Sequence, residues 1–124
     1  NKLTNTILYN LNPAMNEVFA TMPANFNNHK VEIQWGTAWW FLDQKDGMES
    51  QMKILSNMGL LAKFIGMLTD SRSFLSFPRH EYFRRLLCNM IGNDIENGLL
   101  PNDIVFFGKM VENICYHNLK EFIK

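Results

Sequence analysis

Two charged side chains that could take part in chemistry follow closely after an apolar run near the middle of the chain. Asp70 comes directly after residues 64–69, and Arg72 stands two positions later. The planar guanidinium of arginine forms two parallel hydrogen bonds with a carboxylate, so Arg72 is suited to anchoring an acidic small molecule. Taken alone, an aspartate in this position is more typical of a turn or a helix N-cap, and an arginine can equally serve in a surface ion pair.

Structural roles are expected for the other reactive side chains. The polar group Arg79-His80-Glu81 with Arg84-Arg85 lies early in a predicted helix and is expected to form a solvated or interdomain salt-bridge face rather than a catalytic site. Cys88 and Cys115 lie within apolar helical patterns and are expected to be small core residues without a disulfide. Structural or surface roles are also expected for His29, His117, Ser71 and Ser73.

The elements that position Asp70 and Arg72 alternate between strand and helix. β-Branched, aromatic and apolar runs predict strands at residues 6–9, 31–35 and 64–69. The third run is nearly all apolar, which is typical of a strand buried on both faces of a parallel sheet. Helices are predicted after each strand, from apolar residues at helical spacing.

Proline, glycine and capping residues predict where these helices begin and end. Pro23 is expected to end or kink the first helix, and Gly59 to cap the second, which spans 44–58. Pro78 is expected in the first turn of the third helix, with Gly92 as its end. Asp103 opens the last helix. The apolar face of this last helix is expected to contain Phe107, Met110, Ile114, Cys115, Leu119 and Phe122.

Strands that alternate with helices predict βαβ units and an α/β fold with a parallel sheet. Three strands alone would leave two unpaired apolar edges, which favour aggregation, so the chain is expected to be part of something larger. It also begins at Asn1, without an initiator methionine, and soon enters a strand. This start is expected for an excised or incompletely recorded polypeptide, and processing of a longer chain would give the same start.

Composition limits the class of protein. The 124 residues suffice for one compact domain, and the formal net charge of zero indicates neither a nucleic-acid nor an anionic-membrane partner. No apolar run reaches the roughly 20 residues that span a bilayer. With only two cysteines, both in apolar patterns, the expected location is the reducing cytoplasm.

Two segments resemble the C-terminal region of uronate isomerases, which are members of the amidohydrolase superfamily. The first, 35–48, reads WGTAWWFLDQKDGM; the second, 66–76, reads GMLTDSRSFLS and is followed by PRHEYFRR at 78–85. Supporting matches are Leu11-Asn12-Pro13 with Asn16-Glu17, residues 56–61, and Ile114-Cys115-Tyr116 with Asn118. The resemblance covers nearly the whole chain in order.

The resemblance implies a fold. Uronate isomerases are metal-binding (β/α)8 TIM barrels, so residues 1–124 would be the C-terminal three βα units of one barrel domain, with the first strands missing. Catalytic residues of such barrels lie at the carboxyl ends of strands. Asp70 follows the third predicted strand directly, which agrees with this assignment.

The resemblance also implies an activity, namely aldose–ketose isomerisation of D-glucuronate to D-fructuronate and of D-galacturonate to D-tagaturonate in sugar-acid catabolism. In the family, the aspartate that ends the last strand binds the metal and is a candidate for proton transfer, and this role passes to Asp70. Arg72 would bind the substrate, and Trp39 would form a wall of the pocket. A core position is an equal alternative for Trp39 and the favoured one for Trp40.

The same resemblance implies a divalent metal, expected to be Zn, whose other ligands lie outside this chain. The superfamily's His-x-His pair does not occur in the 124 residues. One carboxylate cannot build a catalytic metal site, so the chain is expected to be inactive alone and to need the rest of the barrel or self-association.

Two alternatives remain at this stage. One is another amidohydrolase-superfamily enzyme that performs hydrolysis, which a carboxylate anchor at Arg72 disfavours. The other is a non-catalytic α/β interaction module, which would be stable and monodisperse alone and would have no affinity for uronates or divalent metal.

Overall fold

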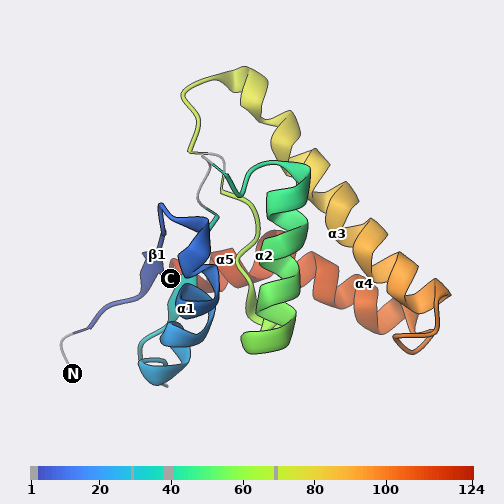
Figure 1. Ribbon diagram of the computed structural model, residues 1–124, viewed down its shortest axis with the longest axis horizontal. Helices are drawn as coiled ribbons and strands as arrows, with labels where there is room; N and C mark the ends of the chain where they lie inside the picture. The colour runs from blue at the N-terminus through green and yellow to red at the C-terminus, as the bar shows by residue number, and fades with distance from the viewer. Residues whose placement is uncertain (1–2, 29, 38–40, 69) are drawn as a thin grey trace.

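A computed structural model describes residues 3–28, 30–37, 41–68 and 70–124. Within them, a two-stranded sheet is accompanied by helices that lead from the sheet to a long helical arm (Figure 1). The strands are β1 (Thr6–Leu8) and β2 (Ile33–Trp35). The α-helices are α1 (Asn16–Thr21), α2 (Lys45–Met58), α3 (Pro78–Glu96), α4 (Ile104–Glu112) and α5 (Asn118–Phe122). Short 3-10 turns and one π-helical turn, Asn113–His117, complete the elements.

The two strands run parallel, as predicted. Thr6 pairs with Ile33 and Leu8 with Trp35, and the amide of Gly36 donates to the carbonyl of Leu8 at 2.9 Å. The connection between them contains α1, which ends at the 3-10 turn Met22–Asn25, where Pro23 was expected to interrupt it. The α/β class with a parallel pair is therefore confirmed.

A third strand was predicted at 64–69. This prediction was wrong for residues 64–68, which the structure describes and which form no strand. Residues 64–68 form no ladder with β1 or β2, and Gly66 takes a left-handed conformation (φ +76°) that interrupts an extended run. The Asn118 side-chain amide donates to the carbonyls of Ala62 (2.9 Å) and Phe64 (2.8 Å). An apolar run becomes a strand only where another backbone pairs with it; here residues 64–67 are buried by helices.

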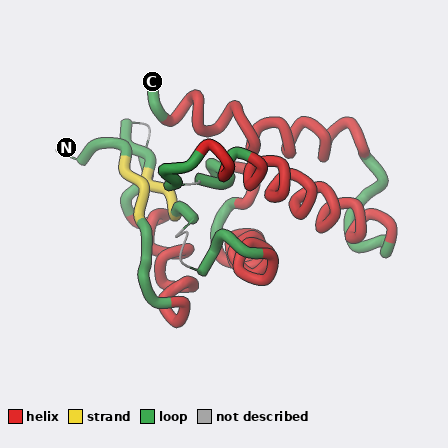
Figure 2. Tube along the Cα trace, turned by 90° about the horizontal axis from the view of Figure 1, so that it is seen from above, coloured by secondary structure: helices red, strands yellow, loops and turns green. Residues whose placement is uncertain are grey.

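Helix α2 connects the sheet to the helical arm. Met48, Met52 and Leu55 of its predicted apolar face are buried together with Trp35 of β2 and Leu87 of α3. Gly59 caps its carboxyl end, as expected. Figure 2, which looks along α2, shows this helix end-on next to α3, with which it is in contact. The core therefore joins α1, α2, α3 and the buried segment 64–67.

The ends of α3 and α4 test the helix-capping rules. Helix α3 continues through Gly92 and ends at Glu96, so Gly92 was wrongly expected to end it. Its C-cap is Asn97, which is followed by Gly98 in the left-handed region (φ +71°). Gly98 takes the left-handed conformation that is common just after a helix, and Gly92 does not. Asp103 caps α4, accepting from the amide of Phe106 at 2.9 Å, as expected. From α4 to α5, Phe107, Ile114 and Phe122 are buried on the expected face.

The carboxyl end of the chain returns to the sheet (Figure 1). The side-chain amide of Asn5, just before β1, donates to the carbonyl of Phe122 at 2.9 Å. Among the helices described here, none is long and apolar enough to cross a membrane.

Candidate functional site

The candidate site lies where β1, β2 and the buried segment 64–68 reach their carboxyl ends. Because β1 and β2 are parallel and paired at Leu8 and Trp35, the residues that follow them, Tyr9 and Gly36, emerge at the same edge of the sheet. Asp70 follows the buried segment. The ends of parallel strands are where such folds place binding residues.

Asp70 has an unusual backbone. Its φ of +43° makes it the one non-glycine residue of the described chain in the left-handed region, and it is exposed. Aspartate tolerates this conformation better than most residues, but strain of this kind is concentrated at functional sites. Asp70 directly precedes the loop that carries Arg72.

Asp70 lies close to Tyr9. Partial burial raises the pKa of the Tyr9 phenol above its ordinary value, and the negative charge of Asp70 raises it further. The structure therefore brings together residues from two elements that are 61 positions apart in the sequence. We did not predict a role for Tyr9; its place as the last residue of a predicted strand was the available signal.

Arg72 is exposed in a loop that two serines shape. The amide of Ser73 donates to Ser71 Oγ at 3.1 Å, and the Ser73 hydroxyl accepts from the amide of Leu75 at 3.2 Å, which caps the turn Phe74–Ser76. The loop-shaping role expected of both serines is confirmed. Among the described residues, no ion pair joins Asp70 to Arg72, so both charges face solvent.

Trp39, the third predicted site residue, lies outside the described residues, as do Trp40 and His29. The chain resumes at residue 41, and Asp43 forms an ion pair with Arg79 of α3 at 2.6 Å. Arg85 pairs with Glu81 one turn apart on the same helix. These pairs confirm the predicted salt-bridge face, and the first of them ties the start of α3 to the segment that follows β2.

Asn10, which is buried, forms hydrogen bonds that hold the end of β1 in place. Trp35 Nε1–H donates to Asn10 Oδ1 at 2.7 Å, and Asn10 Nδ2 donates to Asn16 Oδ1 at 2.7 Å. Asn10 directly follows Tyr9, so this network attaches the end of β1 to β2 and α1.

Replacing Asn10 by alanine is expected to lower the free energy of unfolding by about 1–3 kcal/mol, because it leaves the buried indole N–H of Trp35 without its acceptor. Urea unfolding followed by tryptophan fluorescence measures this. Asn89→Ala, on an exposed position of α3, is the matched control and is expected to change stability by less than about 0.5 kcal/mol. Equal effects of the two substitutions would contradict the supporting role of Asn10.

The two cysteines differ in environment. Cys115 is half-buried against the core, and burial, followed by the nearby Cys88 thiol, raises its pKa. Cys88 is exposed and lines a small apolar groove between α3 and α4, so its expected core position was wrong. Helical spacing alone did not distinguish the core face of α3 from the groove.

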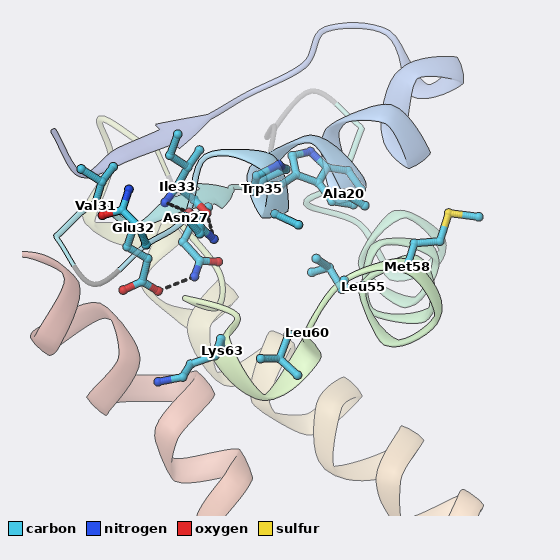
Figure 3. Close-up of a pocket in the computed structure, with 15 residues that line it drawn as sticks. Ala20, Asn27, Val31, Glu32, Ile33, Trp35, Leu55, Met58, Leu60 and Lys63 are labelled. Carbon is cyan, nitrogen blue, oxygen red and sulfur yellow. Dashed lines mark hydrogen bonds between the residues drawn. The ribbon is translucent and has the colours of Figure 1, made fainter. Parts of the chain in front are cut away.

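A cavity of about 550 Å³ is lined by residues that do not include Asp70 (Figure 3). It is bordered by Asn27 and Val31 before β2, by Leu55 and Met58 of α2, and by Lys63 before the buried segment. The cavity therefore adjoins β2, and no residue of β1 lines it. Tyr9, Asp70 and Arg72 are not among its lining residues.

A metal site does not form from this part of the chain alone. No group of three or more His, Cys, Asp or Glu side chains capable of holding a metal ion occurs among the described residues. Catalytic zinc sites use three protein ligands and an open position. Asp70 fits such a site only as one ligand among several.

Comparison with known proteins agrees with the sequence resemblance. The family described as glucuronate isomerase matches residues 1–123. The chain is 64% identical over 125 residues to a uronate isomerase of Flavobacterium johnsoniae, and 64% identical over 126 residues to one of Phocaeicola vulgatus. A uronate isomerase of Haemophilus influenzae is 58% identical over 126 residues.

These alignments cover 99%, 99% and 100% of the chain, in the same order, and 27% of each relative. The chain thus spans about a quarter of the length of the curated relatives that it matches. Because the family match extends over nearly every residue, this chain belongs to the glucuronate isomerase family.

Proposed function

We propose that these residues form part of a uronate isomerase, which converts D-glucuronate to D-fructuronate and D-galacturonate to D-tagaturonate. The observation that carries the proposal is the family match over residues 1–123, which includes Asp70 and Arg72. The protein that we propose to assay is the full-length polypeptide, meaning the longest product of the gene that encodes these residues.

We also propose that residues 1–124 are the last three βα units of a (β/α)8 barrel of the amidohydrolase type. The parallel pairing of β1 with β2 supports this. Segment 64–68 would then become the last strand when the backbone of the first strands pairs with it. The rest of the barrel is thus the proposed partner, and it would cover the exposed apolar side chains Leu11, Phe74, Leu75 and Val105.

The proposed chemistry moves one proton within the sugar. A base removes the proton from C2 of the open-chain aldose, an enediol forms as the C1 carbonyl oxygen is protonated, and return of a proton to C1 with loss of the O2 proton gives the ketose. In this scheme Asp70 carries the proton and Arg72 holds the carboxylate at C6. Residues two positions apart are separated by at most about 7 Å, comparable with the four carbon–carbon bonds between C2 and C6.

Two further roles complete the proposed site. Trp39 would form a wall against the sugar. Asp70 would also supply one ligand to a divalent metal, with Zn as the proposed ion, which would polarise the substrate carbonyl; the remaining ligands would come from outside these 124 residues. The two free thiols support a reducing cytoplasm as the location.

Arg72→Lys in the full-length polypeptide is expected to raise KM about tenfold, with kcat changed less than about threefold. Lysine keeps the charge but loses the two parallel hydrogen bonds to the substrate carboxylate, which contribute equally to ground state and transition state. Steady-state kinetics with D-glucuronate measure both constants. A fall in kcat at unchanged KM would instead assign Arg72 to the reacting end of the sugar.

The deciding experiment incubates the full-length polypeptide, supplied with divalent metal, with D-glucuronate and with D-galacturonate, and measures ketose formation. Ketose is expected from at least one of the two, and none from the 124-residue chain alone. A folded, metal-loaded polypeptide that forms no ketose would overturn the isomerase assignment and favour a hydrolytic relative.

A further inference from the structure

Tyr9 lies on the face of the strand pair opposite to Trp35 and Thr37. A Cβ atom added at Gly36 would lie 2.6 Å from Ile7 Cγ2 and 2.7 Å from Tyr9 Cε1, so both side chains of the first strand lie over Gly36 on one face. The alternate residues turn the other way. Trp35 is buried in the core with α1 and α2, and the Thr37 hydroxyl donates to Gln51 Oε1 of α2 at 3.0 Å.

Three elements therefore converge at one edge. The Tyr9 ring follows β1, Gly36 follows β2, and Asp70, whose charge acts on the Tyr9 phenol, follows the buried segment. The Tyr9 residue is 45% exposed, so part of its side chain is accessible from solvent. In the proposed barrel, the face opposite the helices is the interior, and its carboxyl end is the mouth of the site.

Gly36 makes this arrangement possible. The space that a side chain would need at position 36 is occupied by the aromatic ring of Tyr9, with Cζ only 3.0 Å from the added atom. Glycine is used in strands where another group must approach the backbone closely. Gly36 and Tyr9 thus form one unit, in which the backbone of the second strand supports the ring.

We propose that Tyr9 is a substrate-contacting residue, whose hydroxyl donates a hydrogen bond to the C1 or C2 oxygen of the open-chain sugar acid beside Asp70. The ring of Tyr9 lies against Gly36, and this contact limits where the hydroxyl can lie. The inference rests on the proposed isomerase function and extends it to a residue of the first strand. Tyr9 contacts the reacting end of the sugar, while Arg72 holds the carboxylate end.

The test measures kcat and KM of the full-length polypeptide with Tyr9→Phe and, separately, Gly36→Ala. Tyr9→Phe is expected to lower kcat about tenfold and to change KM less than about threefold, as expected for a lost hydrogen bond that strengthens during the reaction. Gly36→Ala is expected to lower kcat by at least as much, because the added methyl group displaces the ring. Tyr116→Phe makes the same chemical change on the exposed π-helical turn and is expected to leave both constants unchanged.

Each outcome has one meaning. If the unsubstituted polypeptide forms ketose and Tyr9→Phe matches it in kcat and KM, Tyr9 does not contact the substrate, while the isomerase function stands. If the unsubstituted polypeptide forms no ketose, the isomerase function fails and the inference fails with it. Thermal unfolding of Tyr9→Phe at the same temperature as the unsubstituted polypeptide would assign its lower kcat to chemistry; a lower unfolding temperature that accounts for the loss would overturn the proposal.

Discussion

Asp70→Asn is expected to lower kcat for uronate isomerisation about 10³-fold in the full-length polypeptide. Asparagine has nearly the same shape but cannot accept the proton, and loss of a positioned acid–base group costs roughly 10²–10⁴-fold. Asparagine also tolerates the left-handed backbone that Asp70 adopts (φ +43°), so the fold should be retained. Ketose formation at saturating substrate measures the effect, and thermal unfolding verifies the fold.

The matched control is Asp46→Asn in the first turn of α2, an exposed carboxylate that is expected to leave kcat unchanged. Metal content, measured by elemental analysis, separates the two roles proposed for Asp70. Loss of metal with loss of activity would indicate a ligand, whereas loss of activity with full metal content would indicate proton transfer. If Asp70→Asn left kcat unchanged, Asp70 would have no catalytic role and would serve only in the turn.

Gly66→Ala is expected to lower the free energy of unfolding by about 2–4 kcal/mol, through two effects that add. An L-residue at φ +76° is strained, and the new Cβ would lie 2.7 Å from the carbonyl oxygen of Ile114, a backbone atom that cannot move aside alone. Because Gly66 lies in the segment that leads to Asp70, activity should fall together with stability. Urea unfolding of the full-length polypeptide gives the change in free energy.

Two other glycines separate these effects. Gly98 has a φ of +71° but open space around it, so Gly98→Ala carries the strain without the clash and is expected to cost about 1 kcal/mol. Gly92 lies within α3, also in open space, and Gly92→Ala is expected to stabilise the helix by about 0.5–1 kcal/mol. If Gly66→Ala lowered the free energy of unfolding no more than Gly98→Ala, the clash with the Ile114 carbonyl would not contribute, and this close approach would not help to position segment 64–68.

Local chemistry was sufficient to predict most helix boundaries and the family. Pro23, Gly59 and Asp103 act through their own backbones or through hydrogen bonds to residues within one turn, so their roles can be predicted from short stretches of sequence. The apolar spacing of α2 predicted Met48, Met52 and Leu55 as core residues for the same reason. The family resemblance that assigned roles to Asp70 and Arg72 also depends on contiguous residues, those of segment 66–76.

The amino-acid sequence by itself thus determined the family, the helices and the parallel pair, together with the positions of Asp70 and Arg72 in the loop that follows an apolar run. The tertiary structure alone decided that residues 64–68 form no ladder, that α3 passes through Gly92, and that Tyr9, Gly36 and Asp70 meet at one edge. The reason is physical: a strand, a buried site and a close backbone approach each need groups from distant parts of the chain, whereas a helix satisfies its hydrogen bonds within itself.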